Sequence, residues 1–102
     1  MEFTAETLLQ YLVDHGCRSC SFEPGVPLAI SKGADSVAHP FKTPAADDCR
    51  AIARMMLSGG QEEELEEKRR FQMDFGVTKM GRFRLVLELR PSGIAGQFTV
   101  LD

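Results

Sequence analysis

The sequence predicts an α+β fold in which helices pack mainly on one face of a largely antiparallel sheet. Two runs of alternating apolar and polar residues, 71–78 and 82–90, are joined by a turn that contains Gly81. Such a pattern is typical of a β-hairpin. A third strand at 94–101 follows the turn at 91–93 and completes a three-strand meander at the C-terminus. Apolar residues at helical spacing earlier in the chain supply the layer that covers the sheet.

Length, charge and cysteine content limit the classes of function. The 102 residues suffice for one domain with one core, so residues 1–102 are expected to fold as a unit. The net charge of -3, with dispersed basic residues, argues against nucleic-acid binding. The sequence has no apolar run of about 20 residues and no signal peptide, so we expect no membrane insertion. Three cysteines, an odd number, indicate reduced thiols and a cytoplasmic protein.

A first helix is predicted between Thr4, a good N-cap residue, and Gly16, which suits the position after a helix. Phe3 and Leu8 occupy the positions of a hydrophobic staple. The expected buried stripe is Leu8, Leu9, Leu12 and Val13. Three short strands are then expected at 19–22, 28–31 and 36–39, separated by glycine-containing turns.

A second helix is predicted after Thr43, its expected N-cap, with Pro44 in the first turn and Gly59-Gly60 as its end. Its apolar residues recur at helical spacing: Cys49, Ile52, Ala53, Met56 and Leu57.

A third helix is predicted at 61–70, because its acidic start and basic end both favour the helix dipole. Glu64 with Lys68, and Glu66 with Arg70, are spaced as i,i+4 ion pairs. Leu65 is the one clearly apolar residue, so this helix is expected on the surface.

One face of the predicted hairpin is unusually charged, with Asp74, Arg82, Arg84, Glu88 and Arg90. Arg82 and Arg84 share a strand face about 6.5–7 Å apart, and their forked donors suit a phosphate or a carboxylate. Alternatively, they form exposed salt bridges with Asp74 and Glu88. The residues alone leave both interpretations open.

Other chemistry has weaker support in the sequence. Cys17 and Cys20 have C-x-x-C spacing, but this segment follows a helix and enters a strand, so buried or incidental thiols are expected. His15 and His39 have no neighbours that suggest catalysis or a zinc site, and a surface role is expected for both. The sequence contains no G-x-x-x-x-G-K-[ST] loop. We therefore expect no enzymatic activity, no metal and no cofactor.

Several short motifs follow one another in a recognisable order. They are Gly16, Gly25-Val26-Pro27, Met56-Leu57, a Glu-rich helix, Asp74-Phe75, and Gly81-Arg82-Phe83-Arg84-Leu85. In this order the chain resembles the N-terminal domain of PilT-type ATPases, which retract type IV pili, without the motor domain. The resemblance spans nearly the whole chain and implies a PAS-like α+β fold.

The resemblance also implies a role for the hairpin arginines. In that family, matching arginines contribute to the nucleotide site formed with the motor domain of a hexamer. Arg82 and Arg84 match this pair, and Asp74 and Arg90 are possible supporting residues. Other polar positions of the family differ. Ser31 and Thr99 replace two arginines of the family, and Val86 replaces an asparagine.

Three functions follow as hypotheses from the resemblance. The leading one is a non-catalytic interaction module that docks on a pilus (twitching motility) or type II secretion ATPase, or on another copy of itself. A second is the N-terminal part of a full-length hexameric retraction ATPase that contributes arginines to the nucleotide site. A third is a PAS-like sensor with a small-ligand pocket between sheet and helices.

Overall fold

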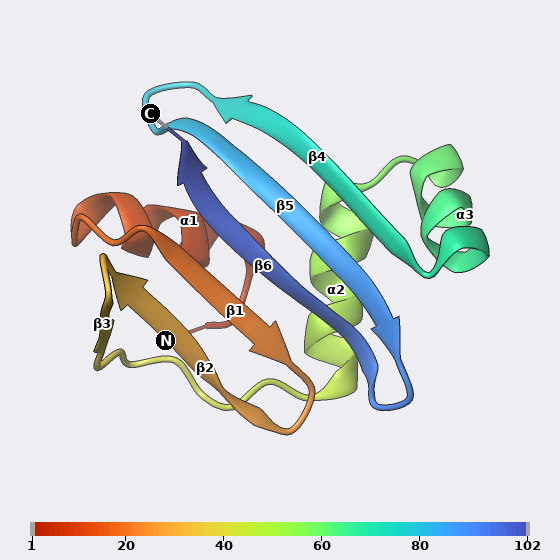
Figure 1. The fold of residues 1–102 in the computed structure, drawn as a ribbon, viewed down its shortest axis with the longest axis horizontal. Coiled ribbons are helices and arrows are strands. Elements are labelled where there is room, and N and C mark those ends of the chain that lie inside the picture. The colour runs from red at the N-terminus through yellow and green to blue at the C-terminus, as the bar shows by residue number, and fades with distance from the viewer. Residues whose placement is uncertain (1, 102) are drawn as a thin grey trace.

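A computed structural model describes residues 2–101, which form three helices and a six-stranded sheet (Figure 1). In chain order the elements are α1 (Ala5–Asp14), β1 (Ser19–Glu23), β2 (Val26–Lys32), β3 (Asp35–Val37), α2 (Ala46–Met56), α3 (Gly59–Lys68), β4 (Arg70–Val77), β5 (Gly81–Arg90) and β6 (Gly93–Leu101). No helix within these residues is long and apolar enough to cross a membrane.

The sheet has the strand order β3-β2-β1-β6-β5-β4, and every neighbouring pair is antiparallel. It therefore consists of two three-strand meanders, β1–β3 and β4–β6, which meet where β1 pairs with β6. In the hairpin, Phe71 lies opposite Leu87 and Phe75 lies opposite Phe83, so the apolar positions of both strands share one face. The predicted hairpin and C-terminal meander are confirmed.

The core lies between this face and the helices. In Figure 1, α1 and α2 lie behind the sheet, and its opposite face has no helix over it. The largest fully buried side chains include Phe83, Phe98, Leu8, Leu12 and Ile52, which come from both layers. The predicted α+β fold with helices on one face is thus confirmed.

Helix α1 begins as predicted but buries a narrower stripe. The Thr4 hydroxyl accepts a hydrogen bond from the Thr7 amide at 3.1 Å, which confirms Thr4 as the N-cap. The prediction that Val13 is buried is wrong, because 37% of this residue is exposed. Successive helical residues differ by about 100°, so Val13 lies one step beyond the buried row that ends at Leu12.

Helix α2 begins later than predicted. Its N-cap is Ala45, whose amide donates to the Asp48 carboxylate at 2.8 Å, so the prediction that Thr43 caps this helix is wrong. Pro44 lies before the helix because its carbonyl accepts the Gly25 amide at 2.9 Å, which ties this segment to the β1–β2 turn.

Gly59 and Gly60 were expected to end α2, but they form the first turn of α3. The reason is Ser58, whose hydroxyl caps α3 and accepts the Gln61 amide. Helix α2 ends at Met56, and Leu57 is already extended.

Helix α3 ends at Lys68, so the prediction that it reaches Arg70 is wrong. Arg69 adopts a left-handed conformation with φ 65°, which turns the chain into β4. The expected helical pair of Glu66 with Arg70 consequently does not form. Within residues 2–101, no ion pair joins Glu64 to Lys68 either.

The third strand of the first meander ends early. The expected strand at 36–39 is β3, Asp35–Val37, and His39 holds the loop that follows it. The Phe41 amide donates to His39 Nδ1 at 3.1 Å, so Nε2 carries the proton and donates to the Leu28 carbonyl at 2.6 Å. His39 therefore fastens this loop to β2 and is partly buried, which refines the surface role expected for it.

Candidate functional site: a charged groove on the helix-free face

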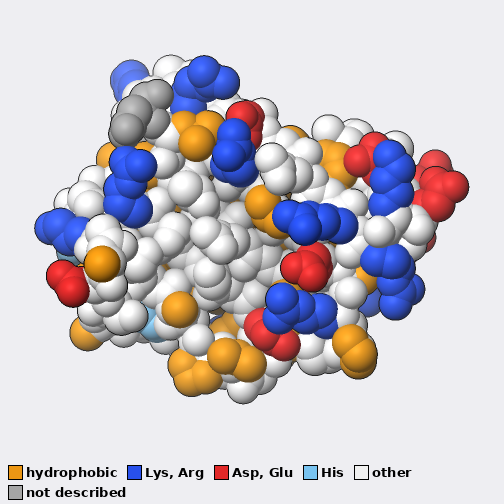
Figure 2. All heavy atoms as spheres, in the orientation of Figure 1, with side chains coloured by type: hydrophobic (Ala, Val, Ile, Leu, Met, Phe, Trp, Pro, Cys, Tyr) orange, Lys and Arg blue, Asp and Glu red, His pale blue; other side chains and the backbone are white. Residues whose placement is uncertain are grey.

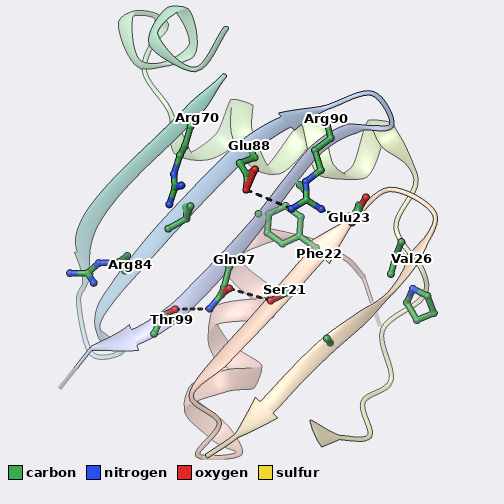
Figure 3. Close-up of a pocket in the computed structure, with 15 residues that line it drawn as sticks. Ser21, Phe22, Glu23, Val26, Arg70, Arg84, Glu88, Arg90, Gln97 and Thr99 are labelled. Atoms are coloured by element: carbon green, nitrogen blue, oxygen red, sulfur yellow. Dashed lines mark hydrogen bonds and ion pairs between the residues drawn. The ribbon is translucent and has the colours of Figure 1, made fainter. Parts of the chain in front are cut away.

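The face of the sheet without helices is hollowed into a groove of about 490 Å³. Side chains from β1, β2, β4, β5 and β6 line it, and Figure 3 shows that they come from both meanders. The groove therefore spans the line where β1 pairs with β6. A volume between about 300 and 1,000 Å³ is typical of ligand sites in proteins.

The floor of the groove is made of small and polar side chains. Gln97 of β6 lies at its centre, where its side-chain nitrogen Nε2 donates to the Thr99 hydroxyl at 3.2 Å. The Ser21 hydroxyl of β1 donates to the side-chain oxygen Oε1 of Gln97 at 3.4 Å. Ala29 and Val86 fill the remaining floor without projecting far from the sheet. The floor thus offers hydrogen-bonding groups beside apolar side chains.

Arg84 lines the groove and is tied to Asp74 of the neighbouring strand. The two residues lie directly opposite each other, and the guanidinium donates from Nε to Oδ1 at 2.8 Å and from Nη2 to Oδ2 at 3.2 Å. This two-pronged contact holds the pKa of Asp74 below its ordinary value and raises the pKa of Arg84. Arg84 therefore forms the exposed salt bridge with Asp74 that the sequence offered as one of its two interpretations.

Arg90 forms an ion-pair cluster at one end of the groove. Its Nη1 donates to the Glu23 carboxylate at 2.8 Å, and its Nη2 lies 3.6 Å from Glu88. Glu23 comes from β1, so this contact connects the two meanders. The sequence had placed Arg90 beside the hairpin arginines, but it could not reveal a partner so distant along the chain.

Arg82 has different surroundings, although it shares a strand face with Arg84. It lies opposite Gly76 and Leu101, is exposed, and does not line the groove. Within residues 2–101 its side chain forms no hydrogen bond or ion pair, and its charge acts only at a distance, to lower the pKa of Asp74. The predicted arginine pair is thus one bound arginine and one arginine whose side chain is open to solvent.

Arg70 is a groove residue that the sequence prediction missed. It is the first residue of β4, and in Figure 3 its side chain extends from that strand towards the middle of the face. The prediction assigned it to the end of a helix because Lys68, Arg69 and Arg70 form one basic run. Alternation that starts at Phe71 could have found it, since the residue before Phe71 belongs to the charged face.

Charges of both signs gather on this face, which Figure 2 shows from the front. Lysine and arginine side chains lie along its upper and right-hand parts, and acidic side chains interleave with them. The centre of the face shows neither sign. Opposite charges that alternate around an uncharged centre suit polar docking better than burial of a large apolar surface.

The cysteines do not contribute to this site. Cys17, Cys20 and Cys49 are free and buried, as expected for structural thiols. Burial raises the pKa of the Cys20 thiol to about 12 and that of Cys49 to about 11, which makes both poor nucleophiles. Among residues 2–101, no three histidine, cysteine or acidic side chains are grouped to hold a metal ion.

Comparison with solved structures shows what this fold resembles. The crystal structure of the pilus retraction motor PilT with bound ADP matches 99% of this chain with a TM-score of 0.84 and 20% identity. The ATPase DotB of Legionella pneumophila matches 95% with a TM-score of 0.76 and 8% identity. The chain spans 30% and 28% of those two structures. No family model and no curated protein matches the sequence. The chain thus has the fold of the N-terminal domain of PilT-type ATPases, as its motifs predicted.

Proposed function

We propose that this chain is a non-catalytic docking module that binds a pilus or secretion ATPase of the PilT type. The fold is that of the domain which accompanies the motor in such ATPases, and the sequence has no phosphate-binding loop of its own. Fold alone does not define a function, so the proposal rests on a particular surface.

The observation that carries the proposal is the helix-free sheet face. An antiparallel sheet can expose one face to water, but here that face is concave and combines polar and apolar side chains with several arginines. Charged groups at the edge of an interface steer association and fix the orientation of a partner. The groove is therefore the part of the molecule best suited to receive an ATPase.

Binding of the purified chain to a purified PilT-type ATPase from the same organism tests this proposal, with biolayer interferometry as the readout. Arg84→Glu should weaken binding strongly, because it replaces the groove cation that lies opposite Asp74 with a like charge. Arg50→Glu makes the same charge change on the exposed side of α2, on the other face, and should bind as the wild type does. Equal binding by both variants, or none by the wild type, would overturn the proposal.

A second copy of the chain is the other partner to consider. Sedimentation equilibrium over a range of concentrations measures self-association directly. Concentration-dependent dimers that Arg84→Glu abolishes would replace the ATPase by a second copy as the partner of the groove. A monomer at every concentration would remove self-association from the proposal.

Arg82 supports a second candidate function, a contribution to the nucleotide site of the partner ATPase. Its guanidinium has no ion pair within residues 2–101, so its forked donors are available to a phosphate. If this holds, Arg82→Ala will leave binding to the ATPase intact and change its rate of ATP hydrolysis. An unchanged rate in a saturated complex would exclude this role.

A further inference from the structure

The charges that line the groove are unequally compensated. Three arginines and two glutamates line it, and with Asp74, which pairs with Arg84, these charges sum to zero. Arg90 binds both glutamates, Glu23 and Glu88, and Arg84 binds Asp74, which lies outside the groove. The Arg70 side chain forms no hydrogen bond or ion pair with any residue from 2 to 101. Among the groove arginines, Arg70 is therefore the one whose side chain has no ion-pair partner within residues 2–101.

The position of Arg70 makes this charge useful to a ligand. Arg70 is opposite Glu88 in the β4–β5 register, yet Glu88 is paired with Arg90 instead. The Arg70 side chain extends from β4 over the face of the sheet (Figure 3), and Val86 and Gln97 belong to the same groove lining. An anionic group that binds there would meet a guanidinium from one side and the Gln97 amide from below.

The size and chemistry of the groove limit the shape of its occupant. An α-helix is about 10–12 Å wide and needs an apolar groove that receives side chains from at least two turns. The lining mixes polar and apolar side chains, and about 490 Å³ holds only a few residues. An extended segment or a loop of a protein fits both constraints, because its main chain can hydrogen-bond with the floor.

We propose that this groove binds an extended acidic segment of a partner protein, with an aspartate or glutamate carboxylate held by Arg70. This inference rests on the proposed docking function and names the chemistry of the docked element. A carboxylate can accept two parallel hydrogen bonds from the Arg70 guanidinium, which has no ion-pair partner within residues 2–101. A phosphate carries about 1.5–2 negative charges, so Glu23 and Glu88 would repel it more strongly than they repel a carboxylate.

Nuclear magnetic resonance of the ¹⁵N-labelled full chain tests the proposal without any ATPase. The probe is the capped pentapeptide acetyl-Ala-Ser-Glu-Ser-Ala-amide, compared with the peptide in which glutamine replaces glutamate. We expect saturable shifts of the amides of Ser21, Arg70 and Gln97 with the glutamate peptide. The glutamine peptide should bind at least fivefold more weakly, because it lacks the charge that Arg70 pairs with.

Two variants with the same change of charge separate the groove from the rest of the face. Arg70→Gln should lose at least fivefold in affinity for the glutamate peptide, whereas Arg82→Gln, outside the groove, should bind as the wild type does. Arg70→Lys keeps the charge but not the forked donors and should lie between them. Both sites are exposed, so the folded spectrum should persist in all three variants.

Several results would overturn the proposal. These are equal binding of the two peptides, shifts confined to the helical face, an unaffected Arg70→Gln variant, or equally tight binding of inorganic phosphate. Shifts of the same amides on dilution without peptide would assign the groove to a second copy instead. Peptide binding together with no binding to an ATPase would keep the groove chemistry and reject only the ATPase as partner, so the two proposals fail separately.

Discussion

Replacement of Gly96 by alanine should destabilise the fold sharply. Gly96 lies between two buried side chains, and a Cβ atom there would be 2.6 Å from Phe22 Cζ and 2.7 Å from Leu87 Cδ2. It would also be 3.0 Å from the Val86 carbonyl oxygen, a main-chain atom held in the β5–β6 ladder. Overpacking a core costs about 1–3 kcal/mol, and three such contacts place this variant near the upper end.

The expected net loss of stability is smaller, because alanine in a strand is more favourable than glycine by about 0.5–1 kcal/mol. The free energy of unfolding should therefore fall by roughly 2 kcal/mol, which lowers Tm by about 8–16 °C in a domain of this size. Urea unfolding followed by circular dichroism measures both the free energy of unfolding and its dependence on urea concentration.

A second glycine in the same sheet serves as the matched control. At Gly76 a Cβ atom meets nothing closer than the Gly81 carbonyl oxygen at 3.9 Å, and the backbone has ordinary strand angles. Gly76→Ala should therefore leave stability unchanged or raise it by up to about 1 kcal/mol. If Gly96→Ala and Gly76→Ala unfold at the same urea concentration, the close packing described around Gly96 is wrong.

Three further results are expected. Arg84→Ala should raise the pKa of Asp74 towards its ordinary value of 3.8, and NMR titration of the carboxyl carbon would show no movement if the pair were absent in solution. Folding raises the pKa of the Cys20 thiol from 9 to about 12, so the folded state keeps a proton that the unfolded state loses. The free energy of unfolding of the wild type should therefore fall as pH rises from 9 towards 12. In urea unfolding, Cys20→Ala should show a flatter dependence on pH. Ser58→Ala should cost about 0.5–1 kcal/mol in the same assay through loss of the α3 cap, whereas Ser58→Asp, which keeps a cap acceptor, should restore stability.

The parts of the fold that were predictable have a strong local pattern. Strict alternation around Phe83 and Leu85 requires one apolar face, and the register observed between β4 and β5 follows from it. The N-cap at Thr4 was likewise visible, because its side chain satisfies a backbone amide only a few residues away. In both cases the physical cause lies within a short stretch of chain.

The predictions that failed depended on distant residues or on competition between local signals. Pro44 is kept out of α2 by a hydrogen bond from Gly25, which no local pattern reveals. Ser58 and the two glycines after it could end one helix or begin the next, and the serine cap decides. The groove was not predictable at all, because Glu23 and Arg90 meet only once β1 has paired with β6.

The line where β1 meets β6 has a consequence for folding kinetics. Each meander can form from strands that are close in sequence, but residue 19 must find residue 99 before the sheet is continuous. The loss of entropy on closing so long a loop opposes this step until the contacts of the ladder and the core offset it. We expect the docking of the two meanders to limit the folding rate, so the groove that spans them forms only in the final, fully closed molecule.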